Sequence, residues 1–234
     1  GNMTLKIDHS RVNAAISKAE LTTSGEITCV IKASPLDNPE TPLAWGFGVA
    51  LVTPFVLALL GISIEHEVSA RLPDFLAGWE ASHGGLADYN HLQELAIYSL
   101  IQVLIFLGVY GVIRNTPLQL MLTPKATRHK RLHEKAREQF YARGLHLTQN
   151  QTGVMIFCAL EDHFVEVIAD TGIYEKVDPS TWSDTISILL RHIKSDDLTG
   201  GFEAAVAKCG EVLTLHFPAG GENPNELPDV LIEI

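Results

Sequence analysis

The sequence predicts an α/β protein, specifically an α/β/α sandwich that is split by an inserted transmembrane helical hairpin. Two uncharged apolar runs of 21 and 19 residues, at 43–63 and 95–113, predict the hairpin. Each run can cross a hydrocarbon core of about 30 Å at about 1.5 Å per helical residue. Trp45 and Pro54 are ordinary in membrane helices and awkward in soluble cores, which disfavours two buried helices of a soluble protein. Helix and strand patterns on both sides of the runs predict the sandwich.

The elements of the α/β domain follow from hydrophobic spacing and turn signals. Before the hairpin, residues 8–22 carry a helical apolar stripe and residues 26–32 form a strand by their β-branched content. The elements expected after the hairpin are a basic amphipathic helix at 125–143, a doubly buried strand at 154–160, an antiparallel strand at 164–169, and helices at about 180–194 and 199–216. Neither half can bury its apolar faces alone, so we expect both to pack into one domain.

The chain therefore divides into four segments. Residues 1–42 form the N-terminal part of the α/β domain, and residues 145–234 form its C-terminal part with an acidic tail. Residues 43–113 form the hairpin, including an acidic connector at 64–94, and residues 114–144 form a basic juxtamembrane helix.

Charge segregation within the net charge of −11 predicts the topology. Residues 114–145 carry 8 basic and 2 acidic side chains, whereas the connector carries 1 basic and 6 acidic side chains. Because cytoplasmic flanks retain Lys and Arg, the connector is expected outside and both termini in the cytoplasm. This predicts a multi-pass protein of the cell (inner) membrane.

The same features indicate the partners. We expect membrane lipids to contact the two spans, and anionic headgroups to attract the basic helix by about 1 kcal/mol per charge. Other membrane proteins are further candidate partners, whereas no aromatic interleaving supports nucleic-acid binding. In the connector, Leu72, Phe75, Leu76 and Trp79 have helical spacing, which fits either an interfacial helix or a small cap over the span ends.

Asp170, Glu175 and Asp178 are the candidate metal ligands. They follow the strand at 164–169, and carboxylates with loop carbonyls suit Ca²⁺ or Mg²⁺. Asp162 belongs to the opposite end of that strand, because about seven residues at 3.3 Å separate it from Asp170. The alternative is a solvated acidic surface, since no EF-hand spacing is present.

Other reactive side chains are weaker candidates. His129 and His133 stand four residues apart, as zinc ligands can, but histidines facing headgroups are the better interpretation because no third ligand is evident. His163 is expected to be exposed in a turn. Cys29, Cys158 and Cys209 are expected to be buried free thiols. No catalytic signature for a nucleophile, phosphate loop or dinucleotide site is present, which favours a non-enzymatic role without deciding the question.

Several short motifs resemble the TPM-domain family. The motifs are TSGE at 23–26, TGV at 152–154, an acidic turn at 161–163, DTGI at 170–173, DLTGGF at 197–202 and NELPD at 225–229. The spans occupy the interval where many members carry a WGxG-like stretch, so the chain looks like a membrane-embedded branch of the family.

The resemblance implies a TPM-like α/β/α sandwich and an association with membrane-protein assembly or repair. For some members it also implies acid phosphatase activity or calcium binding. We therefore expect a non-enzymatic interaction or quality-control module at the membrane. The alternative is a phosphatase assisted by Ca²⁺ or Mg²⁺ that acts through the acidic loops.

Overall fold

The computed structural model describes residues 6–61, 87–220 and 224–234. The chain separates into two compact units, one formed by Gly1–Leu36 with Pro124–Ile234 and the other by Asp37–Thr123. The first unit is therefore assembled from two stretches that are distant in sequence, and each unit is described separately below.

A four-stranded mixed sheet with the strand order β3-β2-β1-β4 is the centre of the first unit. The strands are β1 (Glu26–Lys32), β2 (Gly153–Ala159), β3 (Phe164–Ala169) and β4 (Leu231–Glu233). β1 runs parallel to both β2 and β4, and β3 runs antiparallel to β2. The pairing of β1 with β2 joins the two stretches of the chain, because Glu26 lies opposite Gly153 and Lys32 opposite Ala159.

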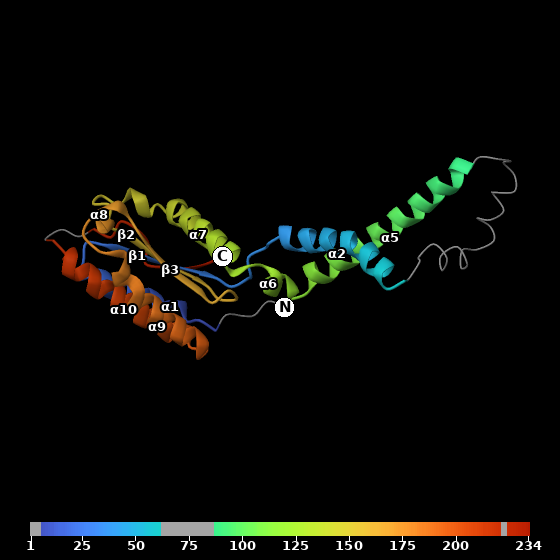
Figure 1. Cartoon of the computed structure of the whole chain (residues 1–234). Helices are drawn as coiled ribbons and strands as arrows, with labels where there is room; N and C mark the ends of the chain where they lie inside the picture. Colours follow the sequence, from blue (N-terminus) through green and yellow to red (C-terminus); the bar gives the residue numbers. More distant parts are fainter. Residues whose placement is uncertain (1–5, 62–86, 221–223) are drawn as a thin grey trace. The chain divides into compact units, whose positions relative to one another are not determined.

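Helices cover both faces of this sheet, which confirms the predicted α/β/α sandwich (Figure 1). One face is covered by α1 (His9–Glu20), α9 (Ser183–Lys194) and α10 (Leu198–His216). The other face is covered by α7 (Lys125–Ala142) and the short helix η1 (Leu145–Leu147). Two further short helices, α8 (Thr171–Tyr174) and η2 (Pro179–Trp182), connect β3 to α9.

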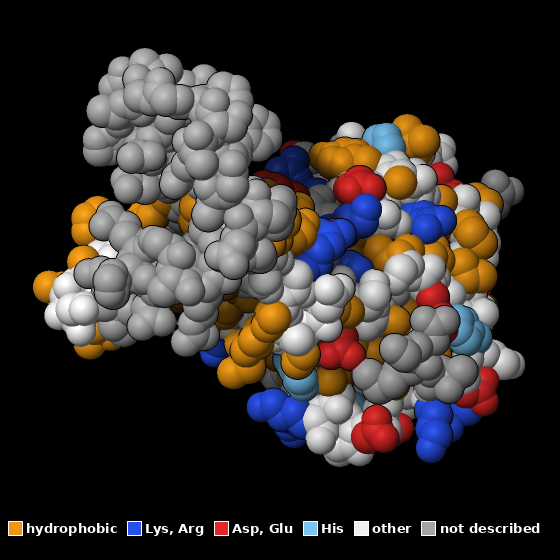
Figure 2. All heavy atoms as spheres, turned by 90° about the vertical axis from the view of Figure 1, so that its right-hand side faces the viewer, with side chains coloured by type: hydrophobic (Ala, Val, Ile, Leu, Met, Phe, Trp, Pro, Cys, Tyr) orange, Lys and Arg blue, Asp and Glu red, His pale blue; other side chains and the backbone are white. Residues whose placement is uncertain are grey.

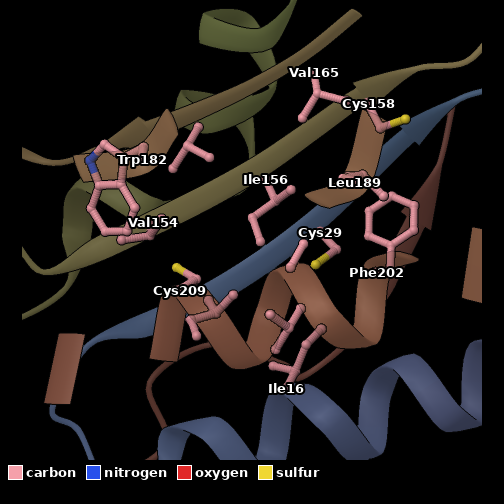
Figure 3. Packing of buried hydrophobic residues seen from close by; sticks show 14 of the residues in the cluster. Ile16, Cys29, Val154, Ile156, Cys158, Val165, Trp182, Leu189, Phe202 and Cys209 are labelled. Atoms are coloured by element: carbon pink, nitrogen blue, oxygen red, sulfur yellow. The ribbon is translucent and has the colours of Figure 1, made fainter. Parts of the chain in front are cut away.

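The alternation of side chains along β1 and β2 builds two hydrophobic clusters. Every residue of both strands is buried, as is typical of strands covered on both faces. Cys29 and Ile156 point toward α1 and α10, where Ile16, Phe202 and Cys209 complete the larger cluster (Figure 3). Alternate residues, including Val30, Met155 and Phe157, pack instead against Leu132, Ala136 and Phe140 of α7. Both layers are therefore held by apolar burial.

Aspartates begin most of the helices in this unit. Each carboxylate accepts a hydrogen bond from a backbone N–H of the first turn, which satisfies a donor that the helix itself leaves free. The capping residues are Asp8 for α1, Asp170 for α8, Asp178 for η2 and Asp197 for α10. Several acidic side chains therefore have a structural role in the local backbone.

The second unit contains the two apolar helices. α2 (Glu40–Leu59) begins three residues before the predicted run, and α5 (Ala87–Asn115) begins within the expected connector at 64–94. In their contact, the Phe47 and Phe106 ring centroids lie 4.7 Å apart, and Gly46 faces the Phe106 ring. The helix proposed around Leu72 and Trp79 lies outside the described residues.

The expected basic segment at 114–144 is divided among three helices. α5 continues to Asn115, α6 (Leu118–Leu122) follows Pro117, and α7 follows Pro124. The two prolines separate the helices because proline lacks the N–H that would continue the preceding helical hydrogen bonds. The amphipathic part of the segment is therefore α7 alone.

Candidate functional site

Asp170 is the most constrained of the three predicted metal ligands. Its Oδ1 accepts a hydrogen bond of 2.7 Å from the N–H of Thr171, and its Oδ2 is buried with no hydrogen-bond partner. Beside it, a Cβ on Gly172 would lie 2.6 Å from the Asn150 carbonyl oxygen and 2.8 Å from that of Gln151. The loop at 150–151 therefore packs closely on the start of α8.

The other two predicted ligands lie further along the same connection. Glu175 is the C-cap residue that follows α8, and it is exposed. Asp178 begins η2, where its Oδ1 accepts a hydrogen bond of 2.8 Å from the N–H of Ser180. The hydrogen bonds from Ser180 lower the pKa of Asp178 below its ordinary value, so this carboxylate is ionised at neutral pH.

Among the residues that the structure describes, no group of three or more His, Cys, Asp or Glu side chains is placed to hold a metal ion. Of the three predicted ligands, Asp170 alone has a buried carboxylate oxygen, Oδ2, without a hydrogen-bond partner; Asp162 Oδ2 and Glu166 Oε2 are in the same state elsewhere in the described chain. A carboxylate oxygen of this kind is the donor that Ca²⁺ and Mg²⁺ prefer. Coordination by Asp170, Glu175 and Asp178 remains a prediction.

The basic helix α7 divides its cations between the domain and the surface. Arg128 is largely buried and pairs with Asp162 of the β2–β3 turn at 3.1 Å, while the side chain of Asp162 is only 1% exposed. Lys135 pairs with Glu138 at 2.8 Å on the same helix. The exposed basic side chains of α7 are Lys125, Lys130 and Arg137. The surface charge of α7 is thus smaller than its sequence indicates.

The Arg128–Asp162 pair lies near the carboxyl end of β1. Burial lowers the pKa of Lys32, the last residue of β1, and the nearby Asp162 carboxylate partly opposes this shift. Lys32 Nζ donates hydrogen bonds of 2.8 Å to both the carbonyl and the hydroxyl oxygen of Ser34. Sequence reasoning missed this cluster, because Arg128 and Asp162 are 34 residues apart and no local pattern connects them.

The histidines of α7 contact β3. The His133 Nδ1 lies 2.5 Å from Glu166 Oε1, and the His129 ring packs 5.2 Å from the Phe164 ring. His163 is exposed in the β2–β3 turn, with a left-handed φ of 48°. These contacts give both α7 histidines a role in docking the helix on the sheet.

The three cysteines are buried free thiols. Burial raises the pKa of all three thiols above the ordinary value, to about 12 at Cys158. A thiol with a raised pKa carries little thiolate at neutral pH, so these side chains are poor nucleophiles.

A second group of carboxylates, which sequence reasoning did not single out, surrounds the C-terminal segment. Glu20 of α1 and Glu26 of β1 are buried, and both contact residues of the NELPD motif at 225–229. Glu26 is also the last residue of the TSGE motif. Two motifs that are about 200 residues apart in the chain therefore meet in the fold.

Two helices of the described chain are long and apolar enough to cross a membrane, Glu40–Leu59 and Ala96–Asn115. Within the most apolar stretch of each helix, 17% and 6% of the residues are buried, respectively. Figure 2 shows one face of the molecule, on which Lys and Arg side chains alternate with acidic and hydrophobic ones. The expectation of two apolar helices of spanning length is confirmed.

Comparisons with known proteins agree with this fold. Residues 116–212 match the family model described as TPM domain. The NMR structure of BA42 protein from the psychrophilic bacterium Bizionia argentinensis is similar, with a TM-score of 0.55 and 15% identity over 100% of this chain and 99% of that one. At this identity the likeness shows the fold alone. No curated protein matches the sequence. The resemblance to the TPM-domain family is thus confirmed by the match over residues 116–212.

Proposed function

We propose that this chain is an integral protein of the cell inner membrane, whose TPM domain is a non-enzymatic binding module on the cytoplasmic side. The exposed apolar surface of α2 and α5 carries this proposal: Phe55 is 72% exposed and Leu59 is 88% exposed. A contiguous apolar surface of this kind is far more stable against lipid than against water.

The topology rests on the cations beside the second span. Arg114 lies in the last turn of α5, and Lys125 and Lys130 are exposed at the start of α7. These residues follow the span by less than about 20 residues, the distance over which Lys and Arg set orientation. An enzyme reporter fused after Ile234 should be active only in the cytoplasm. Activity only outside would overturn the proposed orientation.

Exposed apolar side chains on the α/β unit support a binding role. Leu21 and Leu215 are 76% and 77% exposed. They lie at the same end of α1 and α10, because the hydroxyl groups of their neighbours Thr22 and Thr214 are 2.8 Å apart. We infer that this pair contacts another membrane protein, as part of its assembly or quality control.

In-cell photo-crosslinking tests the binding role. A photoreactive residue at position 21 should capture an integral membrane protein, whereas one at the exposed Arg191 of α9 should not. The capture should be reduced by Leu215→Asp, which places a charge beside the contact. Equal capture from both positions, or capture that Leu215→Asp does not change, would contradict a specific contact.

The second candidate is a metal-assisted acid phosphatase, and the buried, unpartnered Oδ2 of Asp170 favours it. Asp170, Glu175 and Asp178 would hold Ca²⁺ or Mg²⁺, which would supply positive charge to a phosphoryl group. The test is phosphate release from an aryl phosphate by the detergent-purified protein, with and without each cation. Release that requires the cation, fails in Asp170→Asn and survives in Asp184→Asn would support this function. No release under any condition would exclude it for that substrate.

A further inference from the structure

The C-terminal residues 225–234, here called the strap, are bound along one side of α1. Four polar side chains of α1, spaced at successive turns of the helix, contact the strap. They are His9, whose Nε2 lies 2.7 Å from Glu233; Asn13, whose Oδ1 accepts the N–H of Leu231 at 2.8 Å; and Ser17 and Glu20, which both bond Asp229. The strap is therefore bound by the polar side chains of one face of α1.

The other side of the strap lies along β1. Glu26 accepts hydrogen bonds from the N–H groups of Glu226 at 3.3 Å and Leu227 at 3.2 Å. Beyond them, β4 pairs with Cys29–Ile31 of β1, and the N–H of Ile234 donates to the carbonyl of Ile31 at 2.9 Å. The strap thus covers the edge of β1 that faces away from β2.

One proton holds two carboxyl groups together at the centre of this contact. Glu20 and Asp229 are hydrogen-bonded to each other, which requires that one of them be protonated. Asp229 also accepts bonds from Ser17 and from Asn225, so Asp229 is the carboxylate and Glu20 is the acid. Glu20 in turn accepts the N–H of Ile27 at 2.7 Å.

The surroundings keep the proton on Glu20. Burial raises the pKa of Glu20 to about 9, and the nearby carboxylates of Glu26 and Asp229 add to the shift. The other titratable groups that face this cluster are Glu226 of the strap, Cys29 of β1 and Cys209 of α10. Burial is offset at Asp229 by its hydrogen bonds, which lower its pKa.

We propose that the strap is a proton-operated cover for the edge of β1, which detaches when Glu20 loses its proton. Ionised Glu20 would repel Asp229 at hydrogen-bonding distance, and it would be hydrated once the strap leaves. Detachment frees the N–H and C=O groups of residues 29–31. An uncovered edge strand can then pair with another extended segment.

The direction of the pH effect follows from proton linkage. Closure of the strap takes up one proton at any pH between the ordinary Glu pKa of 4.5 and the value of about 9 in the closed state. The opening equilibrium constant should therefore rise by up to tenfold per pH unit in this window and level off above it. The contribution of Glu20 to closure is therefore complete below the lower limit and lost above the upper one.

Amide hydrogen exchange on the full chain in detergent tests the proposal. Each observed exchange rate is expressed relative to the intrinsic rate at the same pH, which gives the protection of each peptide. In the wild type, peptides covering the strap should lose protection by up to tenfold per unit between pH 6 and pH 9. Glu20→Gln should remove this dependence, because its amide can still donate to Asp229 and accept from Ile27. The control Glu211→Gln, an exposed change on α10, should behave like the wild type.

The exchange protection of peptides from β2 distinguishes detachment of the strap from unfolding of the whole α/β unit. If β2 loses protection in parallel with the strap, the proton stabilises the whole domain and the proposal is wrong. It is also wrong if Glu20→Gln retains the wild-type pH dependence, or if strap protection does not change with pH. Asp229→Ala should expose the strap already at pH 6 while β2 remains protected, and protection of the strap in that variant would contradict the proposal.

Discussion

Gly153 begins β2 where the backbone of Leu145 leaves no room for a side chain. A Cβ on Gly153 would lie 3.0 Å from the carbonyl carbon and the Cβ of Leu145, and closer still to its carbonyl oxygen. Gly25 is similarly enclosed, since a Cβ there would lie 3.1 Å from Leu213 and 3.3 Å from the Thr152 carbonyl oxygen. The glycines of the TSGE and TGV motifs thus allow close packing at the starts of β1 and β2.

Gly153→Ala should therefore lower the free energy of unfolding by about 1–3 kcal/mol, the usual cost of overpacking against a rigid neighbour. Urea denaturation, followed by a spectroscopic signal of the α/β unit, measures this change. Gly220→Ala is the matched control, because nothing lies within 4 Å of a Cβ at that position. Equal stability of the two variants would show that the η1–β2 contact relaxes without loss.

At the scale of elements, the Arg128–Asp162 pair fastens α7 to the turn between β2 and β3. The two side chains are 14% and 1% exposed, and each has a further buried polar atom, Arg128 Nε and Asp162 Oδ2, without a partner. Removal of one member leaves the other charge buried and unpaired. The contact is therefore more sensitive to single than to paired substitution.

Asp162→Ala should destabilise the α/β unit by about 3 kcal/mol, within the range measured for broken buried pairs. Arg128→Met combined with Asp162→Ala should restore part of that loss, because no unpaired charge remains. The exposed pair of Lys135 and Glu138 provides the control, and Glu138→Ala should change stability by about 0–1 kcal/mol. Additive losses in the double variant would mean that the two charges do not interact.

The two apolar helices contact each other at a small residue. A Cβ on Gly46 of α2 would lie 2.8 Å from the Phe106 ring, whereas nothing lies within 4 Å of a Cβ on Gly48. Small residues at such contacts allow close packing where lipid supplies no hydrophobic driving force. This asymmetry within one helix offers a matched pair of substitutions.

Gly46→Val should destabilise the packing of α2 on α5 by about 1–3 kcal/mol, since the Phe106 ring must move. Gly48→Val adds the same side chain to open surface and should have little effect. Thermal unfolding of the purified protein in detergent, followed by the circular dichroism signal of the helices, compares the two variants. A larger effect at position 48 would contradict the described packing.

Sequence patterns predicted the long elements and missed those that depend on distant contacts. The strand at 26–32 has the same limits in the structure, because β-branched residues over seven positions define it without help from other elements. β4 has only three residues and follows a tail rich in Pro and Asn. Three residues are too few to show the alternation of apolar and polar side chains by which a strand is recognised.

The candidate site likewise has residues that the sequence indicates and contacts that only the fold reveals. Asp170 and Asp178 were recognisable as carboxylates that follow a strand, but their capping hydrogen bonds depend on local backbone geometry. The polar face of α1 is visible in the sequence at Asn13, Ser17 and Glu20. Nothing local distinguishes a polar face that binds another segment from one that faces water, so only the fold reveals the strap.

At the scale of the whole molecule, the α/β unit is interrupted after Leu36 and resumes at Pro124. Both points belong to the carboxyl-terminal edge of β1 and β2. Lys32 ends β1 opposite Ala159, and its carbonyl accepts the N–H of Leu160. Arg128, in the first turn of α7, pairs with Asp162 just beyond that edge. A short connection is therefore expected to join the two ends without rearranging the sheet.

Replacement of residues 37–123 by a short Gly/Ser linker should yield a folded α/β unit that is soluble without detergent. The physical reason is that both hydrophobic clusters are formed within this unit. A shorter loop also changes the free energy of loop closure by only about 0.6 kcal/mol per halving of its length. Cooperative urea unfolding and retained exchange protection of β1 and β2 would confirm it. Aggregation or loss of cooperativity would instead show that the α/β unit depends on the apolar helices for its folding, so that the inserted segment is part of one folding unit and more than a membrane anchor.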